Sequence, residues 1–316
     1  MNFTSKKLAV IFAIAASFAA GTAHAGPVDM WAMSNGGDGN LWSIDVGGNT
    51  TTLIGAIRDP VLGDVGSGWS TVAETPDKTL YFLRRNQSDV HMFKLDSTNI
   101  QVTGGEVTNV VSLGSTGLGG NLDGLTAGPD GNLYFTAYDN DHSGFARNGL
   151  FRFHPDTGVT DFVGTFANNG GPGGLNSFFT DLAFDPLTGD LVGTGTDNSG
   201  NFIPYRLSGA SVLTGTNHSY SYVDAFTAWN GLGDGLAYNR LTGDLYASSD
   251  SGGVFLVDRT TGAIIQNVGN NAGSSVGTDL AVQADTIPGV VPEPGTLALL
   301  ALGLAGLGFS RRARPS

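Results

Sequence analysis

The chain has 316 residues, no cysteine and a formal net charge of −13 at pH 7. Residues 26–290 hold 27 of the 28 acidic residues but only 10 of the 15 basic ones. A body this acidic repels phosphate backbones and anionic lipid, which argues against nucleic-acid binding. Without cysteine, the fold cannot depend on disulfides.

The first 25 residues have the order of a secretory signal peptide. A polar start with two lysines precedes an apolar stretch at residues 8–20, and Ala23 and Ala25 occupy the two positions that a signal peptidase inspects. We therefore predict export across the inner membrane, cleavage by signal peptidase after Ala25, and a mature chain that starts at Gly26.

The body of the chain, residues 26–287, is predicted to be all-β. It is a succession of short β-branched and aromatic runs separated by Gly, Asn, Asp and Ser, and it contains no long amphipathic helix pattern. The 49 glycines of the chain suit many tight turns. At this length the body can bury one substantial core.

The body contains five similar segments, each of which begins with a short apolar strand. Their aligned apolar anchors are Val72, Leu125, Leu182, Leu236 and Leu280, with spacings of 53, 57, 54 and 44 residues. A repeat of this length is typical of a propeller blade or a solenoid unit.

Each segment is predicted to contain four strands. In the fourth they are GLAYN at 235–239, LYASS at 245–249, VFLVD at 254–258 and AIIQNVG at 263–269, with Thr-Gly turns at 241–244 and 259–262. Four-stranded antiparallel units arranged around an axis form a β-propeller. A β-helix would show shorter coils of about 20 residues.

The two ends of the body are predicted to share one blade. The runs at 31–33, 40–46 and 50–57 correspond to the second, third and fourth strands of a unit that lacks its first strand. The isolated run TDLAVQ at 278–283 can supply it. Such a blade closes the ring and removes an exposed sheet edge. This count gives five blades, with six as the alternative.

An acidic residue precedes the apolar anchor in four segments, as Asp123, Asp181, Asp234 and Asp279. The first strands of propeller blades line the central channel, so these carboxylates are expected to converge. They would repel one another unless a cation or protons lay between them, and Ca²⁺, which takes six to eight oxygen ligands, is the candidate ion. The alternative is that each aspartate accepts backbone N–H bonds in its entry turn.

The C-terminal tail begins with Pro292-Glu293-Pro294, where the prolines stop any strand or helix. The apolar segment from Gly295 to Phe309 follows, and the chain then carries Arg311, Arg312 and Arg314. As a helix this segment is about 22 Å long, which is short against a hydrocarbon core of about 30 Å. The basic end would stay cytoplasmic and leave the body outside.

The tripeptide, the short apolar span and the basic end, in this order, resemble the PEP-CTERM sorting signal. The resemblance implies processing by an exosortase, a membrane transpeptidase-like enzyme, and an exported protein of a Gram-negative bacterium with an exopolysaccharide or biofilm matrix. The alternative is an ordinary C-terminal transmembrane anchor. We thus expect a signal peptide (1–25), a propeller (26–287) and a sorting and anchor segment (288–316), with transient anchoring in the inner membrane before release to the cell surface or extracellular space.

The segments DGLTAGPDGNLYFT at 123–136 and DGLAYNRLTGDLYAS at 234–248 resemble blades of gluconolactonase- and NHL-type propellers. The enzymes of this group hold a metal with a Glu and Asn/Asp set, whereas the body here has only Glu74 and Glu106. That departure favours a non-catalytic surface or matrix protein that binds a polysaccharide or protein. The alternative is a metal-dependent extracytoplasmic hydrolase or lactonase with its site in the central channel.

Overall fold

The structure is a computed structural model. It describes residues 29–34, 39–61, 63, 68–86, 89–118, 121–138, 149–166, 179–196, 202–215, 218–220, 223–224, 226, 228–229, 232–233, 235–249, 253–269 and 279–282. The predicted signal peptide and the predicted tail helix both lie outside these ranges. No helix within the described ranges is long and apolar enough to cross a membrane.

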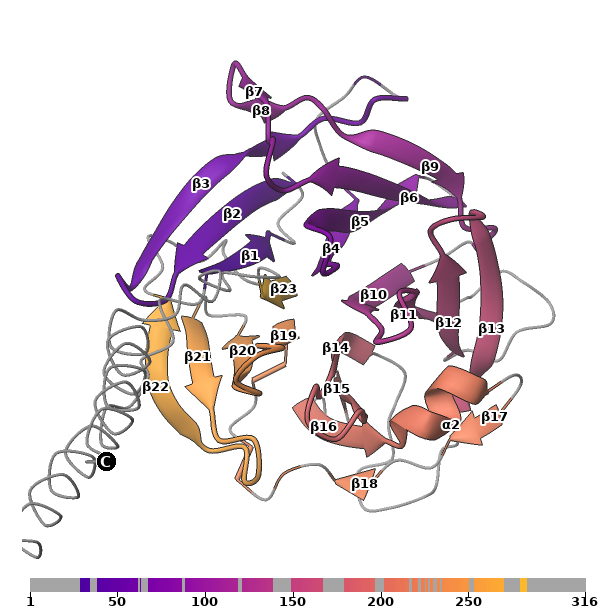
Figure 1. Ribbon diagram of the computed structural model, residues 1–316, viewed down its shortest axis with the longest axis vertical. Helices are drawn as coiled ribbons and strands as arrows, with labels where there is room; N and C mark the ends of the chain where they lie inside the picture. The colour runs from indigo at the N-terminus through magenta and orange to yellow at the C-terminus, as the bar shows by residue number, and fades with distance from the viewer. Residues whose placement is uncertain are drawn as a thin grey trace, which may run out of the picture.

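Five antiparallel sheets are arranged around a central axis, with one strand of each sheet innermost (Figure 1). From the axis outward, blade 2 contains β4 (Trp69–Glu74), β5 (Thr79–Asn86), β6 (Asp89–Asp96) and β9 (Val111–Ser115). Blade 3 contains β10 (Asn121–Ala127), β11 (Leu133–Tyr138), β12 (Gly149–His154) and β13 (Val159–Phe166). Blade 4 contains β14 (Phe179–Phe184), β15 (Leu191–Thr196), β16 (Phe202–Leu207) and β18 (Val223–Asp224). Blade 5 contains β19 (Gly235–Tyr238), β20 (Leu245–Ser249), β21 (Gly253–Val257) and β22 (Ile264–Gly269).

Blade 1 is built from both ends of the described chain, as predicted. Its strands are β23 (Asp279–Val282), β1 (Asp29–Met33), β2 (Asn40–Asp45) and β3 (Thr50–Ile57). The strands β23 and β1 pair antiparallel, with Met30 opposite Val282 and Met33 opposite Asp279. In Figure 1 the late β23 lies directly beside the indigo β1. The ring is therefore closed by strand pairing between residues about 250 positions apart in the sequence.

The hydrophobic core lies between the blades. Each of five clusters of buried side chains draws its members from two neighbouring blades. Between blades 1 and 2, for example, Met33 and Ile57 pack with Phe82 and Phe93, all at most 1% exposed. Burying one such side chain contributes about 1.5–3 kcal/mol. No blade completes its core alone, so the ring is stable only as a whole.

The prediction of five blades is confirmed, and the alternative of six is wrong. The additional residues of the longer repeats form a helix and short strands that extend the existing sheets. The hairpin β7 (Val102–Thr103) and β8 (Glu106–Val107) extends blade 1 beyond β3. The helix α2 (Gly209–Thr214) precedes β17 (His218–Tyr220), which pairs parallel with β13.

Candidate functional site

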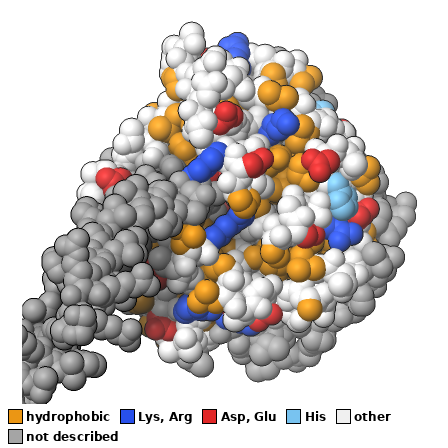
Figure 2. Space-filling view, in the orientation of Figure 1, with side chains coloured by type: hydrophobic (Ala, Val, Ile, Leu, Met, Phe, Trp, Pro, Cys, Tyr) orange, Lys and Arg blue, Asp and Glu red, His pale blue; other side chains and the backbone are white. Residues whose placement is uncertain are grey.

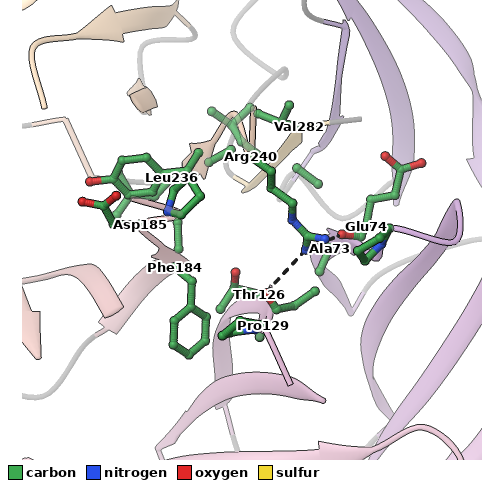
Figure 3. Close-up of a pocket in the computed structure, with 18 of the residues that line it drawn as sticks. Ala73, Glu74, Thr126, Pro129, Phe184, Asp185, Leu236, Arg240 and Val282 are labelled. Atoms are coloured by element: carbon green, nitrogen blue, oxygen red, sulfur yellow. Dashed lines mark hydrogen bonds between the residues drawn. The ribbon is translucent and has the colours of Figure 1, made fainter. Parts of the chain in front are cut away.

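The inner strands of all five blades end around one cavity of about 380 Å³, which we call the axial cavity. Each blade contributes the end of its inner strand, and the polar or rim positions include Glu74, Thr126, Asp185, Arg240 and Val282. Figure 3 shows these residues around the cavity, on strands and turns of different blades, with the carboxylates of Glu74 and Asp185 directed away from its centre. The volume is within the range of small-ligand pockets, which is about 300–1,000 Å³.

Hairpin turns after the inner strands form most of the rim of the axial cavity. In blade 4 the carboxylate of Asp185 accepts the N–H of Leu187 at 2.9 Å, and the N–H of Gly189 donates to the Asp185 carbonyl at 2.8 Å. In blade 5, Asn239 receives the same two bonds from Leu241 and Gly243, both at 2.8 Å. Short side chains with an acceptor oxygen favour such turns.

Arg240 joins three blades across the axial cavity. It lies in the blade 5 hairpin, and its Nη2 donates to the carbonyl oxygen of Glu74 in blade 2 at 3.0 Å and of Ala127 in blade 3 at 3.5 Å. Figure 3 shows the side chain extended across the cavity toward those two strands. A guanidinium fixed by carbonyl oxygens gives an otherwise largely apolar cavity one positioned cationic group.

The acidic groups of the axial cavity are already engaged. Asp185 is fully buried and accepts two bonds from Arg259 of blade 5, at 2.7 and 3.0 Å. Burial opposes ionisation of Asp185, but the N–H bonds from Leu187 and Thr188 and the charge of Arg259 lower its pKa overall. The Glu74 carboxylate accepts the Ser97 hydroxyl at 2.5 Å.

Two of the predicted aspartates meet near the start of the inner strands. Asp181 of β14 and Asp279 of β23 are 0% and 1% exposed, and their side chains hydrogen-bond one another although blade 5 lies between their blades. Asp181 also accepts the N–H groups of Leu182, at 2.7 Å, and of Leu236 in blade 5. Asp279 accepts the N–H of Val72 in blade 2 at 2.9 Å. Each aspartate thus bonds to the inner strand of the next blade.

Burial raises the pKa of both carboxyls well above the usual range, because neither charge is solvated. The two carboxyls lie close enough to hydrogen-bond one another, so a single proton held between them relieves the repulsion of two buried charges. Burial also raises the pKa of the Tyr205 hydroxyl, and the nearby Asp181 raises it further.

Glycines allow the inner strands to approach each other at this level. Gly124 of β10 has a φ of +62°, and a Cβ there would lie 2.8 Å from the Cα of Asp181. Gly235 of β19 packs in the same way, since its Cβ would lie 3.2 Å from the Cα of Asp279. The residue after an aspartate in blades 3 and 5 is therefore a glycine for steric reasons.

The calcium prediction is only partly accessible to the structure. The backbone of Asp123 lies in β10, but its side chain and the whole of Asp234 are outside the described residues. Of the four oxygens of Asp181 and Asp279, three accept backbone N–H bonds, and no group of three ligating side chains occurs among the described residues. Asp181 and Asp279 alone do not fit Ca²⁺, which needs six to eight oxygens. Both aspartates accept backbone N–H bonds, as in the alternative, but the bonds from Leu236 and Val72 come from the next blade and not from the entry turn.

The sequence analysis did not single out Arg240 or Asp185, which define the chemistry of the axial cavity. Both lie in hairpins whose position is visible in the repeats at 184–190 and 238–244. These hairpins border a cavity only because the five blades close into a ring. A single arginine in a turn does not by itself indicate a binding site. On the face in Figure 2, charged side chains are scattered among hydrophobic and other ones rather than gathered in one patch.

Fold and cavity together define a five-bladed β-propeller. The chain also carries a PEP-CTERM protein-sorting motif, matched at residues 290–312. This range includes Pro292, Glu293, Pro294, Arg311 and Arg312, and Arg314 lies just beyond it. The predicted sorting signal is thereby confirmed. The motif implies export, transient membrane association and processing by an exosortase.

The fold is similar to those of several solved propellers. TolB from Acinetobacter baumannii aligns at a TM-score of 0.44 and 13% identity, over 81% of this chain and 66% of that one. A gluconolactonase from Xanthomonas campestris aligns at 0.42 and 16%, over 78% and 77%. The PQQ-bound aldose sugar dehydrogenase from Streptomyces coelicolor aligns at 0.42 and 15%, over 73% and 75%. Likeness at this level says nothing about activity. No curated protein sequence matches the chain.

Proposed function

We propose that this protein is a non-catalytic binding or structural propeller, sorted to the cell surface or the extracellular matrix of a Gram-negative bacterium. The observation that carries the proposal is the way the sorting motif joins the ring. Only residues 283–289 separate the motif from β23, the innermost strand of the blade that closes the propeller. Sorting through this motif would therefore attach a closed ring at its innermost strand. The proposed partner of the ring is an exopolysaccharide or a matrix protein.

The state of the ionisable groups supports a binding role. General acid–base catalysis requires a group that can exchange a proton with a substrate near the working pH. In the axial cavity, Asp185 is paired with Arg259 and the Glu74 carboxylate accepts Ser97. The Asp181–Asp279 pair is buried and bonded to backbone N–H groups. These groups hold the blades together rather than face a substrate.

Sorting is tested by replacing Pro292-Glu293-Pro294 with three alanines in the full chain, expressed in a host that contains an exosortase. We expect the variant to stay in the inner-membrane fraction, unprocessed, while the parent reaches the surface or the medium. Pro288→Ala is the matched control, because Pro288 lies before the matched motif. Identical fractionation of the triple variant and the parent would count against the proposal.

The non-catalytic role is tested on the secreted protein. We expect it to sediment with exopolysaccharide from the same host and to hydrolyse no sugar lactone, with or without Ca²⁺. Lactone turnover that disappears in Asp181→Asn, while the melting temperature stays within a few degrees of the parent, would establish the channel hydrolase instead.

A further inference from the structure

The axial cavity is kept open by small side chains at one position that repeats in all five inner strands. The residue after the apolar anchor is alanine in four blades and threonine in blade 3, and all five line the cavity: Ala73, Thr126, Ala183, Ala237 and Ala281. Packed protein interiors seldom leave a void larger than a water molecule. A space of about 380 Å³ to which every blade contributes therefore indicates an occupant.

The hairpin turns that follow the inner strands give this space an entrance. The fourth residue after the apolar anchor is proline in blades 2, 3 and 4, as Pro76, Pro129 and Pro186, and all three line the cavity while exposed to solvent. Proline restricts φ and suits the first central position of such a turn. Blade 5 has Arg240 there instead, which brings a charge to the entrance that the turn itself does not require.

The guanidinium of Arg240 is held in a fixed orientation across the cavity (Figure 3). The carbonyl oxygens of Glu74 and Ala127 accept bonds from its Nη2, and they orient the group without neutralising its charge. A guanidinium has five N–H donors and pairs with a carboxylate through two parallel hydrogen bonds. Arg240 is also the only basic residue among the described residues that line the cavity.

We propose that the axial cavity binds a small carboxylic acid with an apolar body, whose carboxylate pairs with Arg240. Most of the lining residues are Ala, Gly, Pro, Leu, Val or Phe, so the body of the ligand would contact hydrocarbon. The volume is near the lower end of the range for small-ligand pockets and suits a molecule of about one ring. A sugar ring fits less well, because each buried hydroxyl that finds no partner lowers the affinity.

The surrounding charges favour a single carboxylate. Asp185 is paired with Arg259 at 2.7 Å. The Glu74 carboxylate accepts the Ser97 hydroxyl and is directed away from the centre of the cavity. A polyanion would also meet the surface of a body that holds 27 acidic and 10 basic residues. At physiological salt that surface field is screened over about 8 Å, so it opposes a small ligand in the cavity far less.

The test is calorimetric titration of the full chain in lipid nanodiscs, with empty nanodiscs as the blank. The probes are cyclohexanecarboxylate, its neutral counterpart cyclohexylmethanol, and glucuronate, which carries the carboxylate on a ring with hydroxyls. We expect the first probe to bind at least about tenfold more tightly than either of the others, since a hydrogen bond to a charged group contributes about that factor.

Arginine footprinting locates the bound probe without any substitution. Cyclohexanecarboxylate should slow the modification of Arg240 by phenylglyoxal, read by mass spectrometry, in proportion to the fraction of protein bound. Arg58, whose side chain is 42% exposed and pairs with Glu106, is the internal control and should react at an unchanged rate. Arg240→Gln should bind the acid and the alcohol equally, whereas Arg58→Gln should keep the preference of the parent.

Equal affinity of the parent for the acid and the alcohol, or no binding of either, would overturn the proposal. Glucuronate that binds as tightly as cyclohexanecarboxylate would also overturn it, because the cavity would then select acidic sugars. So would an unchanged rate of Arg240 modification in the bound protein, and this readout stands even where Arg240→Gln fails to fold. None of these measurements depends on sorting or on a polysaccharide, so the proposed function and this site succeed or fail separately.

Discussion

The buried carboxyl pair on the axis should make the stability of the ring depend on pH in a way that one substitution removes. Asp279→Asn keeps an acceptor for the N–H of Val72 and a donor toward Asp181, but it has no proton to lose. The pKa of Asp279 is raised in the folded ring, so the folded state binds the shared proton more tightly than the unfolded chain does. The parent therefore loses stability from about pH 4, near the unfolded pKa, up through the raised folded pKa.

The slope for one proton is about 1.4 kcal/mol per pH unit. Near pH 4 the variant and the parent should unfold within about 1 kcal/mol of each other. The variant should then gain on the parent at up to that slope as the pH rises above about 4, and the gain should level off once the pH passes the raised folded pKa of Asp279. Aspartates with lowered pKa, such as Asp161 and Asp258, act in the opposite direction, since their contribution is lost as the pH falls below about 4. They are common to both proteins and cancel in the difference.

The assay is urea unfolding at unit pH steps from 4 to 8, followed by tryptophan fluorescence. Asp156→Asn removes the same charge at an exposed turn and is the control. If the difference between Asp279→Asn and the parent does not vary with pH, the two carboxyls do not share a buried proton and the reasoning is wrong.

Three further outcomes follow from the contacts within and between blades. Gly124→Ala should cost about 1–2 kcal/mol for its positive φ and about 1–3 kcal/mol more for the clash with Asp181, whereas Gly131→Ala, at φ +81° with nothing within 4 Å, should cost only the first amount. Equal losses in urea unfolding would disprove the close approach of β10 and β14. Arg259→Gln should destabilise by about 1–3 kcal/mol, because it leaves the buried Asp185 carboxylate with the more distant Arg206; a loss below measurement error would show that the pair is not formed. Leu280→Ala should cost about 2–5 kcal/mol and speed proteolysis of the ring, since Leu280 is 2% exposed in the closing strand; unchanged proteolysis would mean that β23 does not close the blade.

The sequence carried enough information to predict the blades because their strands are periodic. The anchors Val72, Leu125 and Leu182 recur at nearly even spacing, and all three are at most 1% exposed. The shared blade was predictable as well, because one end of the body lacks a first strand and the other end has a spare one. Both features can be recognised in the sequence alone, because they depend on the local residue pattern and on the number of strands in each repeat.

The additions and the site were not predictable, for physical reasons. The strands β7 and β8 have two residues each, too few to show a period. The strand β17 pairs with β13 of the preceding blade, a choice that only the assembled ring defines. Which aspartates meet on the axis depends on blade number and on irregularities such as that between Asp123 and Leu125. Arg240 reaches Glu74 across 166 residues of sequence, so no local signal records the contact.

The pairing of β1 with β23 also sets the order in which the ring can close during synthesis. The N-terminal strand is made first, and its inner partner follows only when residues 279–282 have been added. Until then, the edge of β1 and the apolar faces that blade 1 shares with blades 2 and 5 have nothing to cover them. Ring closure must wait for almost the whole body to emerge, and contacts this distant in sequence form slowly. The strand that closes the propeller is therefore the last one of the body to be made, and only residues 283–289 separate it from the sorting motif.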